Sequence, residues 1–419
     1  MKKRANRPAE KFSLKCPACS AQYSPGTFTC DRCHAPTVVS INLERLPAPQ
    51  FLQPELPAPF SQSLWKYFEL LPLNDPQWIV SQGEGLTPLI NSSRLAKTIG
   101  IRILLLKNET VNPTGSFKDR QITLSVSKMH EAGARTVAVV SSGNVAASAA
   151  SYSAIAGIRC FVFAPSNAPD EKLVQARMYG AVFHKVNTLS SSRIFKLVLK
   201  CSERKGWRLL STTGLYNPYQ VEGAKTIAYE LVEQAELPDW IIAPVGGGGL
   251  LGALWRGFSE LKELGLCRRV PRLVGVQSSA CTPLVNALSR NLSPAETIAS
   301  PVEVKPTIAG AIADDVLFDA YTAIPAVRLS GGIALSVTDE QMLQAEKLLA
   351  QEAGVFAEPA SAATVAALKQ LRDSGTVDQA DSVCCIVTGS GFKDMASAKK
   401  MVSAPPVIEA AEDAFLELE

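Results

Sequence analysis

The sequence lacks long apolar runs and carries little net charge, and each absence argues against a class of protein. No stretch of about 18 consecutive apolar residues occurs in it, so we expect no membrane-spanning helix. The formal net charge of +3 gives no bulk attraction to nucleic acid or to a membrane surface. The basic start, residues 1–7, is not followed by the apolar core of an export signal. We therefore expect a soluble cytoplasmic protein.

What is present is an ordinary globular composition and a cluster of cysteines. With 419 residues, 47% of them hydrophobic, the chain is long enough for two or three domains. Two Cys-x-x-Cys pairs near its start contain Cys16, Cys19, Cys30 and Cys33. Such pairs complete the tetrahedral shell of a zinc ion, with His34 as a substitute ligand. Because about 30 residues cannot bury enough surface to fold unaided, we expect a structural zinc in a zinc-ribbon-like extension.

A proline-rich segment and an aromatic segment follow the cysteines. Residues 46–60 contain five prolines among small and polar residues, which predicts a semi-rigid linker. Residues 65–68 read Trp-Lys-Tyr-Phe, and we expect a short helix there that packs on the main body of the protein.

From about residue 79 onward, short β-branched runs alternate with amphipathic segments. We expect strands at 103–107, 136–140, 160–163, 208–211, 240–244, 272–276 and 382–387. We expect helices at 146–156, 171–179, 220–234, 250–264, 336–353 and 360–372. This alternation predicts an α/β fold with mostly parallel sheets covered by helices. In such folds ligands bind beyond the carboxyl ends of the strands, so the loops after strands are the candidate sites.

One of these loops presents a lysine in an unusual position. Residues 112–120 read Asn-Pro-Thr-Gly-Ser-Phe-Lys-Asp-Arg, and the breakers at its start should end the preceding strand. Ser116 could then cap a helix that carries Ile122, Val126 and Met129 on one apolar face. A cation in the first turn opposes the helix dipole, which lowers the pKa of the Lys118 amine. A neutral amine suits a Schiff base to pyridoxal phosphate, whereas the alternative is a solvated first-turn lysine.

Three further loops carry small or hydroxyl residues. Residues 141–144, Ser-Ser-Gly-Asn, let the backbone approach a flat ligand, and Asn144 could bond a ring substituent; the alternative is a plain turn. Residues 246–249 are four glycines between a strand and a helix, which predicts a cradle for a phosphate monoester. This run lacks the lysine of a P-loop, and a merely flexible loop is its alternative. After the last strand, Thr388 and Ser390 could face a pyridine nitrogen.

Taken together and in this order, the motifs resemble the fold-type-II pyridoxal-phosphate enzymes, and most closely the threonine synthase family. The resemblance covers most of the chain after residue 80. Its motifs lie at residues 83–89, 112–120, 141–144, 217–223, 358–363 and 388–394. It implies a two-domain, tryptophan-synthase-β-like fold with open twisted sheets flanked by helices. A cysteine knot at the front also occurs in some members of the family.

The resemblance also implies domain boundaries. We place the zinc-ribbon-like extension at residues 1–40 and the linker with its short helix at 41–78. The large cofactor-binding domain then comprises residues 79–118 and 218–405. The small substrate-side domain comprises residues 119–217, and we expect a homodimer.

The family's site residues carry over to this chain motif by motif. Lys118 would form the Schiff base and move protons in catalysis. The implied cofactor contacts are Phe117 beside the ring, Asn144 at the phenolic oxygen, Gly246, Gly247, Gly248, Gly249 and Leu250 at the phosphate, and Thr388 and Ser390 at the pyridine nitrogen. The implied substrate contacts are Ser141, Ser142, Gly143 and Arg120.

Three residues depart from the threonine synthase pattern. Val145 and Gln220 replace a polar and a basic residue, and Leu250 follows an all-glycine loop as in serine and threonine dehydratases. Arg120 or Lys393 could compensate as a partner for a substrate phosphate. The overall pattern of motifs still favours a first hypothesis, threonine synthase, which converts O-phosphohomoserine and water to threonine and phosphate. The second is β-elimination or β-replacement on serine, threonine or diaminopropionate.

Two interpretations from other classes are weaker. A cofactor-free binding protein would not need the intact Lys118, Asn144 and glycine loop. Nucleic-acid binding by the cysteine knot would call for interleaved aromatics and a basic helix, which the sequence does not have. We expect a small amino-acid substrate, with no nucleic acid and no membrane as partner.

Overall fold

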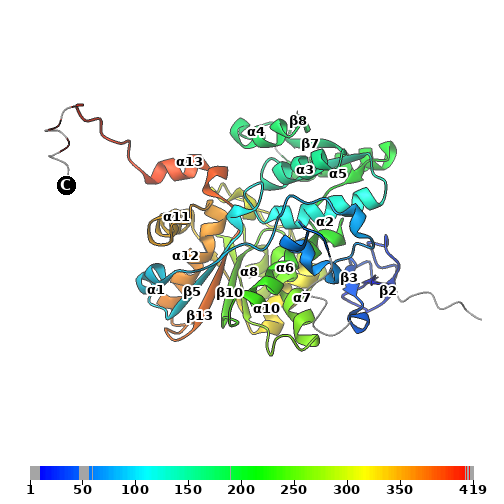
Figure 1. Cartoon of the computed structure of the whole chain (residues 1–419), viewed down its shortest axis with the longest axis horizontal. Helices are drawn as coiled ribbons and strands as arrows, with labels where there is room; N and C mark the ends of the chain where they lie inside the picture. Colours follow the sequence, from blue (N-terminus) through cyan, green and yellow to red (C-terminus); the bar gives the residue numbers. More distant parts are fainter. Residues whose placement is uncertain are drawn as a thin grey trace, which may run out of the picture.

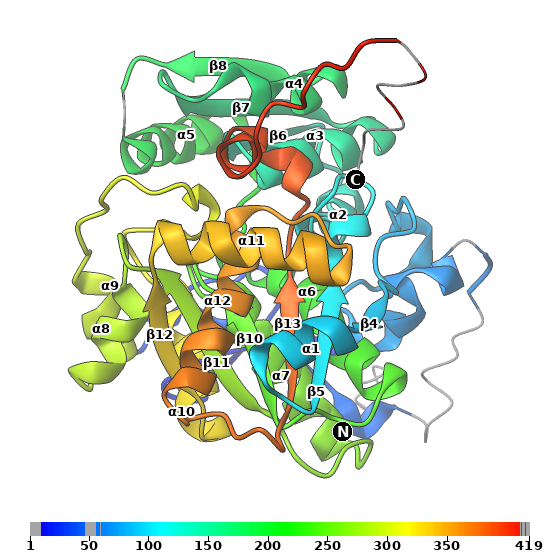
Figure 2. The same ribbon diagram turned by 90° about the vertical axis from the view of Figure 1, so that its left-hand side faces the viewer.

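The computed structural model describes residues 10–46, 56–58, 60–188, 190–410, 412 and 415. The strands in this part of the chain form a three-stranded, a six-stranded and a four-stranded sheet. None of the described helices combines the length and the apolar character that crossing a bilayer requires. Figures 1 and 2 show the four-stranded sheet in the upper part of the molecule and the six-stranded sheet in the lower part.

The N-terminal ribbon is the three-stranded antiparallel sheet. It consists of β1 (Phe12–Lys15), β2 (Gln22–Tyr23) and β3 (Val38–Ile41), in the order β2-β1-β3. Its apolar side chains share a buried cluster with Tyr219, Tyr229 and Leu261 of the main body. The ribbon therefore does not hang free but lies beside α6 and α7, as Figure 1 shows.

The six-stranded sheet forms the centre of the larger part. Its order is β12-β11-β10-β13-β5-β4, and β4 alone runs antiparallel to its neighbour. The strands are β4 (Leu89–Asn91), β5 (Ile103–Asn108), β10 (Trp240–Pro244), β11 (Arg272–Ser278), β12 (Ile333–Val337) and β13 (Ser382–Val387). Their near-continuous apolar sequences suit strands that are buried on both faces.

Helices cover both faces of this sheet. On one face lie α1 (Ser93–Ile99), α11 (Asp339–Ala353) and α12 (Pro359–Asp373). On the other lie α6 (Pro218–Gln234), α7 (Gly249–Glu263), α8 (Pro283–Ser289) and α10 (Ala320–Ser330). Short helices α9 (Pro294–Ala299) and α13 (Met395–Ala398) complete this part. Figure 1 shows these two groups of helices on opposite sides of the six-stranded sheet.

The four-stranded sheet is parallel and has the order β8-β7-β6-β9. Its strands are β6 (Thr136–Val140), β7 (Arg159–Pro165), β8 (Val182–Val186) and β9 (Arg208–Leu209). Its helices are α2 (Lys118–Glu131), α3 (Asn144–Ile155), α4 (Asp170–Met178) and α5 (Ser191–Lys205). Ile122 and Val126 of α2 are fully buried and Met129 is partly buried, so the expected apolar face is confirmed.

Most predicted elements are present, and several boundaries differ. The strands at 136–140, 240–244 and 382–387 agree at both ends, and the aromatic segment is a buried 3-10 helix, η4 (Leu64–Leu70). The helix predicted from residue 336 is wrong at its start, because Ser336 and Val337 end β12. Thr338 instead caps α11 in a capping box with Gln341. The linker predicted at 46–60 lies largely outside the described residues.

The predicted cap at Ser116 is also wrong. Phe117 occupies the cap position of α2 without a side-chain cap bond, while Ser116 is fully buried. The backbone of Ser116 pairs with Gly389, which follows β13, and this pairing explains its conformation.

Candidate active site

A cavity of about 700 Å³ lies where strands of both larger sheets end. Its wall includes residues from the loops that follow β6, β10 and β13, as expected for ligand sites in α/β folds. The predicted site residues on this wall are Phe117, Lys118, Ser141, Ser142, Gly143, Asn144, Gly246, Gly247, Gly248, Gly249, Leu250 and Thr388. Loops far apart in the sequence are thus brought to one cavity.

Lys118 begins α2 and faces the cavity as a partly buried side chain. Burial lowers the pKa of its amine to about 8, although Asp314, Asp319 and Glu358 act in the opposite direction. Its Nζ atom lies 4.5 Å from the centre of the Phe117 ring. The expected lowering of the pKa is therefore present, and burial is its main cause. Such an amine has a substantial neutral fraction near pH 8 and can act as a nucleophile.

At Gly246, Gly248 and Gly249 the glycine loop leaves little room for a side chain. A Cβ atom at Gly246 would lie 2.6 Å from Asp314 Oδ2, and one at Gly248 would lie 2.9 Å from Ala323 Cβ. Gly248 also has a φ of +97°, which disfavours other residues. The loop opens α7, so its backbone amides gather at a helix N-terminus, where an anion is stabilised. Burial raises the pKa of the neighbouring Asp314, while Lys118 and the Gly247 amide lower it.

Asn144 and Glu358 meet across the cavity. The Asn144 side-chain amide donates to Glu358 Oε1 and Oε2 at 3.1 and 3.2 Å. Burial raises the pKa of Glu358, while the bond from Asn144 lowers it. Glu358 and Asp314, which also line the cavity, were not among the predicted site residues. Glu358 stands at the start of a recognised motif and could have been found, whereas Asp314 has no local signal.

Two hydroxyls after β13 have different positions. Thr388 lines the cavity, and its Oγ1 shares a hydrogen bond of 2.8 Å with Ser361 Oγ. The Gly389 amide donates to Ser361 Oγ at 2.7 Å, so the backbone helps to fix Thr388. Ser390 is not part of the cavity wall; its Oγ accepts from the Phe392 amide at 3.3 Å. Thr388 is thus the hydroxyl in position to meet a bound ring.

The substrate contact expected of Arg120 is not possible in this structure. Arg120 is fully buried and lies outside the cavity wall. Its Nε donates to Glu109 Oε2 at 2.6 Å, and its Nη2 donates to Glu230 Oε2 at 2.8 Å. Thr226 accepts from Nη1 at 2.9 Å, so the guanidinium is already saturated. Gln220 is also fully buried away from the cavity wall, bonded to Gln121.

Lys393, the other cation expected to meet a substrate anion, does line the cavity together with Lys172. Lys393 donates to Gln175 of α4, and Lys172 lies 3.6 Å from Asp394. Burial lowers the pKa of Lys393. These two lysines are the cations of the wall besides Lys118 within the described part of the chain.

The four N-terminal cysteines form a compact group. The sulfur atoms of Cys16, Cys19, Cys30 and Cys33 all lie within 4.8 Å of one another. Two of the separations are 3.4 and 3.5 Å, close to the roughly 3.8 Å between thiolates on one zinc ion. This donor set fits a structural tetrahedral site. His34 is not in the group, so the substitute ligand is not needed.

Comparison with known proteins agrees with this geometry. A family model described as "Pyridoxal-phosphate dependent enzyme" matches residues 80–389. The chain therefore belongs to the family of pyridoxal-phosphate-dependent enzymes. Within it, the chain is 40% identical to a threonine synthase of Methanocaldococcus jannaschii, over 83% of this chain and 84% of the relative. It is 38% identical to a threonine synthase of Methanosarcina acetivorans, over 97% of this chain and 98% of the relative.

Solved structures of related enzymes share the fold. A serine racemase from Dictyostelium discoideum is 25% identical with a TM-score of 0.59, over 73% of this chain and 92% of that chain. Diaminopropionate ammonia lyase from Escherichia coli has a TM-score of 0.66 over 78% of this chain and 90% of that chain. At 14% identity, the second likeness shows the fold alone. The expected fold type II is confirmed.

Proposed function

We propose that this protein is a threonine synthase that converts O-phosphohomoserine and water to threonine and phosphate. The observation that carries the proposal is the meeting of Lys118, Asn144, Thr388 and the glycine loop at one cavity. Threonine synthases at 38 to 40% identity over most of the chain supply the choice of reaction.

The residues of the cavity fit pyridoxal phosphate. When bound, the cofactor supplies an electron sink for bonds broken at the substrate's Cα. Lys118 would hold it covalently, and the amides of Gly246 to Gly249 would hold its phosphate. Thr388, as a neutral hydroxyl, would leave the pyridine nitrogen largely unprotonated. Asn144 has two amide hydrogens, so it could bond the phenolic oxygen with one and keep Glu358 with the other.

Lys118 is also suited to proton transfer. With a pKa of about 8, its amine exists in comparable neutral and charged amounts near that pH. Once released from the cofactor, it could remove a proton from the substrate and return it to another carbon. The hydroxyls of Ser141 and Ser142 and the amides of their loop would hold the substrate carboxylate.

Lys172 and Lys393 are the candidates to hold the substrate phosphate. They come from α4 and from η8 (Gly391–Lys393), two elements that meet at the cavity wall. Arg120 cannot take this role because it lies outside the cavity wall, and its removal from the buried network would leave Glu109 without its ion-pair partner and Glu230 with Lys107 alone.

A second candidate function rests on the charge of the wall. Five carboxylates line the cavity (Glu171, Asp314, Asp315, Glu358 and Asp394), against three lysines and no arginine in the described wall. Because carboxylates outnumber lysines on this wall, it favours a substrate whose side chain is neutral or carries an amine over one that carries a phosphate. The second candidate is therefore β-elimination on a substrate such as diaminopropionate, serine or threonine.

Product analysis separates the two candidates. Purified protein with pyridoxal phosphate is incubated with O-phosphohomoserine, diaminopropionate, serine and threonine in parallel. The proposal predicts release of one phosphate per threonine formed. Turnover of diaminopropionate or serine to an α-keto acid, with no phosphate release from O-phosphohomoserine, would establish the second function instead.

A further inference from the structure

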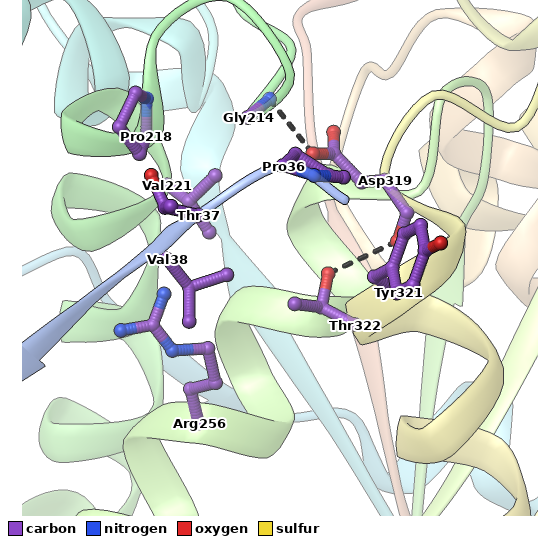
Figure 3. Close-up of a pocket in the computed structure, with 10 residues that line it drawn as sticks. All are labelled: Pro36, Thr37, Val38, Gly214, Pro218, Val221, Arg256, Asp319, Tyr321 and Thr322. Carbon is purple, nitrogen blue, oxygen red and sulfur yellow. Dashed lines mark hydrogen bonds between the residues drawn. The ribbon is translucent and has the colours of Figure 1, made fainter. Parts of the chain in front are cut away.

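The N-terminal ribbon and the glycine loop lie on opposite sides of one small contact region at the start of α10, which we call the junction. A small internal cavity of about 20 Å³, shown in Figure 3, marks the place. Its wall combines residues 36–38 of the ribbon, Gly214, the start of α6, Arg256 of α7 and the first residues of α10. A space of this size holds about one water molecule, so these elements are nearly in contact.

Two hydrogen bonds and one aromatic packing contact hold the ribbon against this junction. Arg256 of α7 donates to the Val39 carbonyl at 2.5 Å, and the Gly26 amide donates to the Tyr219 hydroxyl at 3.2 Å. Tyr321, in the first turn of α10, packs against the cluster of Cys16, Cys30 and Ala35. The cluster that contains two of the predicted metal ligands therefore packs against α10 through one aromatic ring.

Two residues before Tyr321, Asp319 touches the opposite side of the junction. Its backbone amide donates to the Gly247 carbonyl at 2.8 Å. Its Oδ1 accepts from the Gly214 amide at 2.7 Å, as Figure 3 shows. Its Oδ2 lies 3.0 Å from the position of a Cβ at Gly249. Asp319 is 7% exposed, so it joins the glycine loop and the loop before α6 from within the protein.

We propose that Asp319 is a positioning residue for the glycine loop and that the four-cysteine ribbon holds it in place through Tyr321. Occupancy of the cysteine site and affinity for pyridoxal phosphate are then coupled. The coupling is reciprocal, because each ligand stabilises the junction that the other requires. The inference rests on the proposed phosphate-binding role of Gly246–Gly249.

The direct test compares full-length protein with zinc bound and after zinc has been removed by a chelator. Pyridoxal phosphate affinity is measured by its absorbance and by quenching of tryptophan fluorescence. We expect the dissociation constant to rise about tenfold on zinc removal, and zinc to leave more slowly when the cofactor is bound. Equal affinities in the two forms would overturn the inference. Failure of the zinc-loaded protein to bind any cofactor would overturn the proposed function instead.

Variants at the junction make the test independent of global unfolding. Tyr321→Ala, with its zinc content verified, should bind the cofactor about tenfold more weakly, whereas Tyr321→Phe keeps the ring and should match the unmodified protein. Asp319→Ala should weaken cofactor binding. Asp319→Asn should bind the cofactor as the unmodified protein does, because its amide oxygen can still accept from the Gly214 amide. If the zinc-loaded Tyr321→Ala protein binds the cofactor normally, the ribbon does not position the loop.

Discussion

At the scale of single residues, the environment of Lys118 sets its chemistry. Burial lowers the pKa of its amine to about 8, against the pull of three nearby carboxylates. An ordinary lysine with a pKa near 10.5 is only about 0.3% neutral at pH 8, whereas this amine would be about half neutral. The sequence indicated a lowered pKa from helix position, but the burial that produces it depends on residues far away in the chain.

The first prediction concerns cofactor capture. Only the neutral amine attacks the aldehyde of pyridoxal phosphate, so the rate of capture by cofactor-free protein should increase with pH, with a midpoint near 8. Stopped-flow absorbance between pH 6 and 10 measures this rate. The Lys118→Ala variant provides the background. A midpoint near 10 would show that the amine is not perturbed.

At the scale of elements, alternating strands and helices made the site loops predictable. The glycine loop and the 141–144 loop lie where strand ends had been expected, because local patterns define those ends. Arg120 was misjudged for the opposite reason. Its partners Glu109 and Glu230 lie 11 and 110 residues away in sequence, and no local pattern shows that they would enclose it.

The second prediction tests the glycine loop as an element. Gly248→Ala adds a Cβ only 2.9 Å from Ala323 in a backbone with a φ of +97°. We expect at least about tenfold weaker cofactor binding, because the loop must move to relieve this contact. Gly375→Ala is the matched control, with a φ of +72° and open space around its Cβ. If both variants bind the cofactor equally well, the loop geometry is not needed for binding.

At the scale of the whole molecule, buried charges connect parts that lie far apart in sequence. Arg120 of α2 and Lys107 of β5 both pair with Glu230 of α6, and Arg120 also pairs with Glu109. The network joins the helix that carries Lys118 to the larger sheet and its helices. The domain boundaries at residues 118 and 218 stay a prediction, although the two sheets divide the strands in a compatible way.

The third prediction follows from this network. Arg120→Met leaves the carboxylates of Glu109 and Glu230 buried without their shared cation, so we expect a loss of about 3–5 kcal/mol in the free energy of unfolding. Arg94→Met, which breaks the exposed pair with Glu352, should cost less than about 1 kcal/mol. Urea unfolding measures both. Equal small losses would make Arg120 a candidate substrate contact again.

The most direct test of the whole account is to locate the cofactor on the chain. Protein loaded with pyridoxal phosphate is treated with a hydride reductant, which makes the bond between cofactor and lysine permanent, and its peptides are analysed by mass spectrometry. We expect one cofactor per chain, on the peptide that contains Lys118. Labelling of Lys172 or Lys393 instead, both of which line the same cavity, or no labelling at all, would contradict it.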